Sequence, residues 1–324
     1  MNSAEPEVSV VVATRNRAGR LAELLAALRA QSLSAERFEV IVVDDGSGDG
    51  TAATLKQGAE QGGLALRWFR HDRPTGPAIA REEGWRAARA PLIAFTDDDC
   101  APAPGWLEAA VAAARENPGA IVQGATLPMP WELHRSGLFS RTNRVTSFDP
   151  YFRTCNVLYP RELLERVDGF DTDAFAGPPS TEDADLGWRA VKAGAPSVFA
   201  PKALVYHAVN RLGPIGTLRL SGRGATPGLL SYGRHAELRR ATFAKGIFYN
   251  GSHYLLVRTL IALLLPRPLA WLAPWLAGPY LLEVTYRSRD RGAGPLLAPY
   301  FVLYDLIELV AVARAAIRYR IPAL

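Results

Sequence analysis

Short runs of aliphatic residues alternate with amphipathic stretches over residues 8–126, and this alternation constrains the fold more than any other feature. Between the first two runs, Leu21, Leu24, Leu25 and Leu28 recur at helical spacing and give one apolar face. Strands that alternate with helices form β-α-β units around a mostly parallel sheet. We therefore predict an α/β fold whose strands are the segments VSVVVAT, FEVIVVDD, LALRWF, PLIAFTDD and AIVQGATL.

The remainder of the N-terminal part gives further signals. Polar residues at 49–51 suit the start of a helix. A polar stretch from 131 to about 153 predicts an acceptor-side insert or a mobile loop. The segment CNVLYP is expected to be extended. Further helices are expected at residues 77–88, 161–166 and about 182–193.

Composition sets broad limits. The chain has 324 residues, 48% of them hydrophobic, which is enough to bury a full core. The formal net charge of +5 invites anionic partners such as nucleotide phosphates, nucleic acid or an acidic lipid surface, and does not choose among them. Cys100 and Cys155 have neither metal-type spacing nor the pattern of a disulfide framework. No secretory signal is visible, so we expect the N-terminal domain to be cytoplasmic.

Three strongly apolar segments occupy the C-terminal third: TLIALLL, LAWLAPWLAGPYLL and LLAPYFVLYDLIELVAVA. Prolines interrupt the first pair, and Asp305 and Glu308 interrupt the third. None is therefore the uninterrupted run of about 20 apolar residues that a simple transmembrane helix requires. We expect interfacial or re-entrant helices on a membrane surface, with a buried core or a homodimer interface as the alternative. Arginines that suit anionic head groups flank the segments: Arg287, Arg289, Arg291, Arg314, Arg318 and Arg320.

These patterns divide the chain into three regions. Residues 1–210 are expected to form the N-terminal α/β domain. Residues 211–245 contain glycines and arginines that predict a linker or loop region. Residues 246–324 are expected to form a C-terminal apolar helical region that associates with a membrane.

Polar residues follow three of the predicted strands, in the segments 14–17, 44–47 and 97–99. In open parallel sheets, ligands bind at the carboxyl ends of the strands. Carboxylates gathered at one edge repel one another unless a cation or a hydrogen-bonded ligand compensates them. The pattern therefore indicates a site for a metal and a polyhydroxy ligand.

Each residue of this edge also has an ordinary structural explanation. Asp97 and Asp99 can direct two carboxylates to one side of an extended segment, and such oxygen ligands suit Mg²⁺ or Mn²⁺ bridging a diphosphate. Solvated aspartates or a nearby helix N-terminus would produce the same sequence. Asp44 or Asp45 can accept hydrogen bonds from a ribose hydroxyl or a base. Arg15 and Arg81 can bind phosphates, although surface positions would explain all four equally well.

A second acidic cluster, TEDAD at 181–185, opens a predicted helix. Its carboxylates can be ordinary capping residues, or Asp183 can act as the general base that accepts the proton of an attacking hydroxyl. His207 follows the extended segment ALVYH. It can supply a nitrogen ligand to the same cation, although a lone histidine is more often structural.

The order VSVVVATRNR, EVIVVDDGSGDGT, GPAIAREEGWRAA, FTDDDC, CNVLYPRELLERVDGFD and TEDADLGWRAVKAG resembles the family 2 glycosyltransferases, which have the GT-A fold. The similarity covers roughly residues 7–210. It implies an inverting transfer, in which an acceptor hydroxyl attacks the anomeric carbon of a nucleotide sugar as the nucleoside diphosphate departs. It also implies a divalent cation, Mn²⁺ or Mg²⁺. The Q-x-x-R-W motif of processive members is absent, which favours transfer of a single sugar.

The resemblance also implies roles for individual residues. Asp183 matches the catalytic base. Glu82 stands where the family's A-R-N segment has asparagine, which leaves that corner of the nucleotide pocket undefined. The metal ligands implied are Asp97, Asp99 and His207. The residues assigned to the nucleotide-sugar pocket are Thr14, Arg15, Asn16, Asp44, Asp45, Arg81 and Asp98.

Other classes of protein fit less well. A non-catalytic nucleotide-sugar-binding or scaffold protein would not require Asp183. A sugar nucleotidyltransferase would begin with a glycine-rich loop and a lysine, and a dinucleotide oxidoreductase with G-x-G-x-x-G, and neither is present. Nothing indicates nucleic-acid binding. We expect a nucleotide-sugar donor, which the resemblance implies is UDP-linked, a glycan or lipid-linked acceptor, and a peripheral location on the inner face of the cell membrane.

Overall fold

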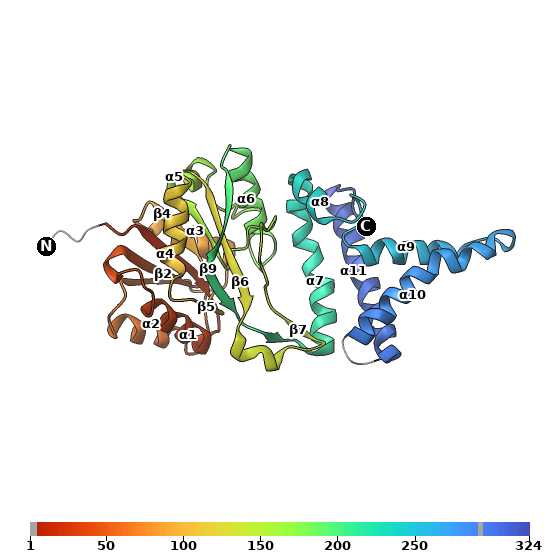
Figure 1. Ribbon diagram of the computed structural model, residues 1–324, viewed down its shortest axis with the longest axis horizontal. Coiled ribbons are helices and arrows are strands. Elements are labelled where there is room, and N and C mark those ends of the chain that lie inside the picture. Colours follow the sequence, from red (N-terminus) through yellow and green to blue (C-terminus); the bar gives the residue numbers. More distant parts are fainter. Residues whose placement is uncertain (1–4, 291–293) are drawn as a thin grey trace. The chain divides into compact units, whose positions relative to one another are not determined.

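The computed structural model describes residues 5–290 and 294–324, and Figure 1 shows its helices and strands. The chain forms two compact units. Unit 1 comprises Met1–Arg135 and Arg141–Asn210, and unit 2 comprises Ser136–Ser140 and Arg211–Leu324.

Unit 1 is built on a mixed sheet, which in the described part of the chain has eight strands in the order β3-β2-β1-β4-β8-β6-β9-β5. The pairs β1–β2, β1–β4, β2–β3 and β6–β9 are parallel, whereas β8 and β5 pair antiparallel to their neighbours. The α/β class and the mainly parallel sheet are confirmed. The strands are β1 (Val8–Thr14), β2 (Phe38–Asp44), β3 (Leu66–Arg70), β4 (Leu92–Phe95), β5 (Cys100–Pro102), β6 (Ile121–Pro128), β8 (Val157–Pro160) and β9 (Ser197–His207).

Helices cover both faces of this sheet. The predicted leucine face of α1 is buried and packs with the even-numbered valines of β1 and with residues of α2 and α4. On the other face, α3 lies so close that a Cβ at Gly84 would meet Val11 Cγ1 at 2.6 Å. The helices are α1 (Ala18–Arg29), α2 (Thr51–Glu60), α3 (Pro77–Ala87), α4 (Trp106–Glu116), α5 (Arg161–Arg166) and α6 (Glu182–Lys192).

Short elements complete the connections. Residues predicted as a polar insert, 131 to about 153, are largely irregular apart from a short 3-10 helix, a two-residue strand and a bridge between Thr126 and Val145. A two-stranded sheet pairs β7 with β10. These elements are η1 (Ala35–Arg37), η2 (Pro130–Arg135), β7 (Ser140–Arg141) and β10 (Asn210–Arg211).

Unit 2 is helical, and it corrects one expectation. Residues 211–245, predicted as a linker or loop, instead form the 22-residue helix α7 and the shorter α8. The glycines that suggested a loop sit inside α7: a Cβ at Gly233 would meet Ile321 at 2.8 Å, and one at Gly222 would meet Ile307 at 3.2 Å. The elements are α7 (Gly213–Arg234), α8 (Ala236–Thr242), α9 (Gly251–Leu263), η3 (Arg267–Leu272), α10 (Ala273–Asp290), η4 (Gly294–Leu297) and α11 (Ala298–Tyr319).

Two acidic residues that seemed to interrupt an apolar run are paired inside unit 2. Asp305 of α11 binds Arg287 at 2.6 Å and accepts a hydrogen bond from Tyr280 at 3.0 Å. Glu308 accepts from Asn250 and lies 3.2 Å from His253 Nε2. These contacts tie α11 to α9 and α10.

Among the described residues, one helical stretch, Pro295–Tyr319, is long and apolar enough to cross a membrane. A third of its most apolar window is buried within the structure. Asp305 and Glu308, which interrupt the apolar sequence of this segment, do not interrupt the helix.

Candidate active site

The carboxyl ends of β1, β2 and β4 meet at one edge of the sheet in unit 1. The β1–β2 register sets Thr14 directly beside Asp44. Thr14 Oγ1 donates a hydrogen bond to Asp98 Oδ2 at 2.8 Å, across 84 residues of sequence. The three predicted polar segments therefore lie together, as the parallel topology requires.

Asp45 is held by the loop that follows β3. Its carboxylate accepts hydrogen bonds from the Thr75 amide at 2.6 Å and from the Gly76 amide at 2.9 Å. His71 Nδ1 lies 2.9 Å away. Burial raises the pKa of Asp45, but the hydrogen bonds from Thr75, His71 and Gly76 outweigh it and hold the pKa below its ordinary value. Asp45 is thus a fixed, ionised acceptor at the sheet edge.

The loops after β1 and β2 are bonded to each other. Asn16 has a left-handed backbone (φ +53°), and its side-chain oxygen accepts from the Gly48 amide at 2.7 Å. Asp44 is fully buried and accepts from the Ser47 amide at 2.9 Å. Its Oδ2 has no hydrogen-bond partner within the described chain, although Arg70 Nε approaches to 3.7 Å. Arg15 is exposed.

Arg81 joins two acidic segments that are far apart in sequence. From α3, its guanidinium donates to Asp97 Oδ1 at 2.8 Å and to Glu182 Oε1 at 3.0 Å. Burial lowers the pKa of Arg81, but the negative charges of Asp97, Glu182 and Asp183 raise it by a larger amount. The pKa therefore lies above its ordinary value, and the side chain stays charged. Arg81, expected to face a phosphate, therefore holds the carboxyl end of β4 against the start of α6.

Asp183 lies in the first turn of α6 and is partly exposed. Burial of its carboxyl group and the neighbouring Glu182 raise its pKa to about 7, against the opposing effect of Arg81. A carboxyl group with a pKa near neutrality exchanges a proton readily under physiological conditions. The ordinary capping role is weak here, because the Asp183 carboxylate accepts a hydrogen bond from the adjacent Ala184 amide, one residue further along the chain.

Asp99 and His207 form a potential metal-binding pair. His207 Nε2 lies 3.5 Å from Asp99 Oδ1, and His207 Nδ1 lies 2.9 Å from the carbonyl oxygen of Ala208. That carbonyl can only accept, so Nδ1 carries hydrogen and Nε2 is directed at the carboxylate. Burial raises the pKa of Asp99, but His207 and Arg17 outweigh this and keep it below its ordinary value. An ionised oxygen and an imidazole nitrogen at this separation fit Mn²⁺ or Mg²⁺.

A third group, Cys100, lies within the same cluster, in which ligand atoms are within 4.8 Å of one another. Burial raises the pKa of the Cys100 thiol well above its ordinary value, so it remains protonated and is a poor ligand for a hard cation. Among the described residues, Asp97 is not part of this cluster. Its carboxylate is bound by Arg81, whereas the sequence pattern grouped it with Asp99 as a ligand.

Arg17 and Asn210 contact the same carboxylates and were not among the residues predicted for the site. Arg17 Nη1 forms an ion pair with Asp99 Oδ2 and lies 3.4 Å from Asp98 Oδ1. Asn210 Nδ2 donates to Asp99 Oδ2 at 3.2 Å. The sequence offered one indication that Arg17 belongs to the site, its position three residues after Thr14 at the end of a strand. No sequence feature indicated Asn210.

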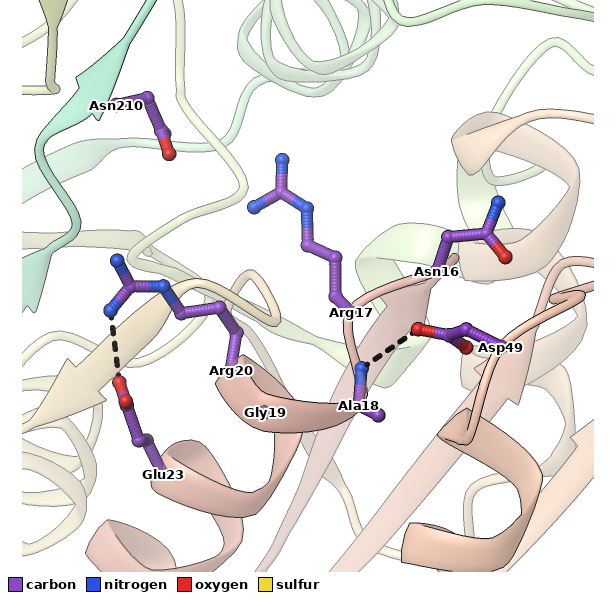
Figure 2. Close-up of a pocket in the computed structure, with 8 residues that line it drawn as sticks. All are labelled: Asn16, Arg17, Ala18, Gly19, Arg20, Glu23, Asp49 and Asn210. Atoms are coloured by element: carbon purple, nitrogen blue, oxygen red, sulfur yellow. Dashed lines mark hydrogen bonds and ion pairs between the residues drawn. The ribbon is translucent and has the colours of Figure 1, made fainter.

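An open cleft of about 510 Å³ lies beside this cluster, and Figure 2 shows its lining side chains. Arg17 and Asn210 connect it to Asp99. Asp49 accepts a hydrogen bond from the Ala18 amide, and Arg20 pairs with Glu23, as the dashed lines in Figure 2 mark. The cleft therefore opens at the start of α1, next to the candidate metal pair.

Comparisons of sequence identify relatives of this chain. It is 32% identical over 213 residues to the pre-mycofactocin glycosyltransferase of Mycobacterium tuberculosis, covering 62% of this chain and 42% of that protein. It is 32% identical over 227 residues to the validoxylamine A glucosyltransferase of Streptomyces hygroscopicus, covering 59% of this chain and 53% of that protein. The chain thus spans about half the length of these curated relatives.

Solved structures share its fold. A mannosyltransferase from Pyrobaculum calidifontis, in complex with GDP-Man and Mn²⁺, matches with a TM-score of 0.58 at 22% identity. The match covers 98% of this chain and 88% of the mannosyltransferase chain. TarS of S. aureus with UDP-GlcNAc has a TM-score of 0.56 at 18% identity, covering 97% of this chain and 91% of its own. At these identities the likeness shows the GT-A fold alone.

The sequence model described as glycosyl transferase family 2 matches residues 9–170, which is half of the chain. The matched region contains the ends of β1, β2 and β4 together with Arg81. This chain therefore belongs to glycosyl transferase family 2.

Proposed function

We propose that this protein transfers a single sugar from a nucleotide-sugar donor to an acceptor hydroxyl, with inversion at the anomeric carbon. The observation that carries the proposal is the contact of Arg81 with both Asp97 and Glu182. This contact brings the start of α6, and with it Asp183, to the sheet edge where Asp44, Asp45 and the 97–99 segment lie. A donor at that edge has a carboxyl group of suitable pKa beside it.

Asp183 acts as the general base. The acceptor hydroxyl loses its proton to the Asp183 carboxylate as its oxygen bonds to the anomeric carbon. The bond from that carbon to the diphosphate oxygen breaks at the same time, and the nucleoside diphosphate leaves with the electron pair. A base with a pKa near 7 is half ionised at neutral pH and can still accept a proton from a polarised hydroxyl.

The donor's nucleotide is proposed to bind at the ends of β1 and β2. Asp45 is fixed by four contacts from His71, Thr75 and Gly76, and it presents an ionised acceptor to a base or ribose hydroxyl. Thr14, Arg15, Asn16, Asp44 and Asp98 remain the proposed neighbours of the same ligand. We propose a UDP-linked donor; the solved relatives bind GDP-Man in one case and UDP-GlcNAc in another, so both nucleotides belong in the test.

Asp99 and His207 would hold a divalent cation, Mn²⁺ or Mg²⁺. When bound, that ion supplies positive charge that stabilises the negative charge of the departing diphosphate. Asn210 donates to Asp99 Oδ2 and so orients the carboxylate, and the Ala208 carbonyl fixes the imidazole tautomer. We propose that Asp97 serves the donor mainly through Arg81.

The acceptor is proposed to be a lipid-linked or cell-envelope glycan. On this proposal the catalytic domain is the part of the chain up to about residue 210, it faces the cytoplasm, and the C-terminal helices keep it on the inner face of the cell membrane. The exposed apolar side chains of those helices support a membrane surface.

A donor screen tests the proposal. Purified full-length protein is incubated with UDP- and GDP-sugars in Mn²⁺, in Mg²⁺ and in EDTA, and release of nucleoside diphosphate is measured. We expect one donor to be selected and its turnover to require metal and to be lost in Asp99→Ala. Asp168→Ala, which changes an exposed carboxylate that pairs with Arg86, is the matched control. Absence of binding to every donor by a well-folded protein would instead favour a non-catalytic scaffold.

A further inference from the structure

The outer half of the α9–α10 hairpin exposes large apolar side chains to solvent. We call residues 260–275 the hairpin tip. Within it, Leu263 and Leu264 are 76% and 83% exposed, and Trp271 and Trp275 are 67% and 74% exposed. About two turns further along α10, Leu281 and Leu282 are also exposed. Exposed apolar side chains gathered in this way mark a site of interaction.

The packing of the hairpin shows why this surface remains uncovered. At its base, Leu256 of α9 packs with Tyr280 and Val284 of α10 and with Phe301 of α11. Further out, Ala262 is the one buried apolar residue of the described tip. A helix that is apolar on all sides lies in an apolar environment. The tip therefore needs a partner outside unit 2.

Charge identifies the kind of partner. The segment 251–282 contains no aspartate or glutamate, and its charged residues are Arg258 and Arg267. Arg267 is exposed within the turn at the tip. Arg258 donates to the Trp275 carbonyl oxygen and stacks on Tyr254. Tryptophans with arginines and without acidic residues are typical of segments that lie at the interface of a bilayer with anionic head groups.

The lengths of the helices exclude a spanning hairpin. The 13 residues of α9 measure about 20 Å at 1.5 Å per residue. This arm of the hairpin is shorter than the roughly 30 Å of a hydrocarbon core, and Arg267 would have to cross that core. Helix α11 is bound into unit 2 by Asp305, which pairs with Arg287, and by Glu308, which accepts a hydrogen bond from Asn250. Insertion of α11 across a membrane would break both contacts.

We propose that the hairpin tip inserts into one leaflet of an anionic bilayer, with Leu263, Leu264, Trp271 and Trp275 in the interface and Arg258 and Arg267 at the head groups. This deepens the proposed membrane contact by naming the segment that makes it, and it does not require transfer activity. It also corrects the role expected for Arg287, which pairs with Asp305. Arg291, another expected contact, lies outside the described residues.

The test uses full-length protein with vesicles of phosphatidylcholine alone or mixed with phosphatidylglycerol, some carrying brominated acyl chains. We expect binding to the mixed vesicles and quenching of tryptophan fluorescence, because bromine reaches Trp271 and Trp275. Leu263→Ser with Leu264→Ser is expected to weaken vesicle binding by about tenfold or more, given the apolar area removed. Leu133→Ser, at a leucine of unit 1 that is 53% exposed, is the matched control and is expected to bind as the parent does.

Circular dichroism and donor binding are measured on the same samples, so loss of folding or of the proposed activity is distinguished from loss of membrane binding. Vesicle binding unchanged by the double substitution would overturn the proposal, as would equal binding to uncharged vesicles. A double variant that lost self-association while binding vesicles normally would assign the surface to a second copy of the chain. Quenching that persisted in Trp271→Phe with Trp275→Phe would place the contact elsewhere.

Discussion

Arg17 forms an ion pair with Asp99, the carboxylate that also faces His207 at 3.5 Å. The same guanidinium lies 3.4 Å from Asp98. Arg17 thus places positive charge where a divalent cation held by Asp99 and His207 would place its own. The two cations compete for one carboxylate, and we expect metal binding to displace Arg17.

Arg17→Ala is therefore expected to bind Mn²⁺ more tightly than the parent, by about five- to tenfold, because removal of one positive charge a few ångströms away lowers the repulsion. Isothermal titration with Mn²⁺ alone measures this without turnover. Arg20→Ala is the control, since Arg20 lines the same cleft but pairs with Glu23 and Glu132. Equal or weaker Mn²⁺ binding in Arg17→Ala would contradict the competition.

The pH dependence of donor turnover reports on Asp183. Because the proposed base is the ionised form of Asp183 and its pKa is about 7, kcat/KM is expected to fall below pH 7 as the carboxylate takes up one proton. Glu182 raises this pKa, so Glu182→Gln is expected to move the acid limb to lower pH. A profile flat from pH 6 to 8, or a limb that Glu182→Gln moved to higher pH, would show that another group controls the rate.

Asp183 is also expected to reduce stability at neutral pH. Its pKa rises from the ordinary value of 3.8 to about 7 in the fold, so the folded state binds more protons than the unfolded state between those values. Stability therefore falls as pH rises through this window. Asp183→Asn removes the effect, and its Tm should exceed that of the parent by a few degrees at pH 8 but not at pH 4. Thermal melts across this range test it; a lower Tm at pH 8 would be the opposite result.

Gly76, whose amide donates to Asp45, lies against the loop that precedes α6. Its backbone has φ +110°, and a Cβ there would lie 2.0 Å from the Gly177 carbonyl oxygen. Gly76→Ala is expected to lower stability by about 2–4 kcal/mol and to weaken donor binding. Gly19→Ala, in α1 with nothing within 4 Å of a Cβ, should be neutral or slightly stabilising. Denaturant unfolding of the two variants compares them, and similar losses in both would disprove this account of Gly76.

Local periodicity was sufficient to predict the N-terminal fold. The leucine face of α1 and the valine strands carry their burial pattern in neighbouring residues, and the parallel topology then gathers Thr14, Asp44 and Asp98 at one edge. The same local signals misassigned α7, because a glycine that permits close helix packing looks identical in sequence to one that ends a helix.

Contacts between distant residues were not predictable. Arg81 and Glu182 are 101 residues apart, and Asp99 and Asn210 are 111 apart. No spacing rule links such pairs. The ion pair that binds Asp97 to Arg81, and so separates it from the Asp99–His207 pair, follows from the position of α3 over the sheet.

The central claim is that Asp183 accepts the proton of the attacking hydroxyl. Release of nucleoside diphosphate from the selected donor, compared between the parent protein and Asp183→Asn at pH 8, tests it most directly, with donor binding measured in both. We predict that Asp183→Asn binds the donor within a fewfold of the parent and loses about a thousandfold or more in turnover. Turnover within tenfold of the parent, at equal donor binding, would contradict the claim.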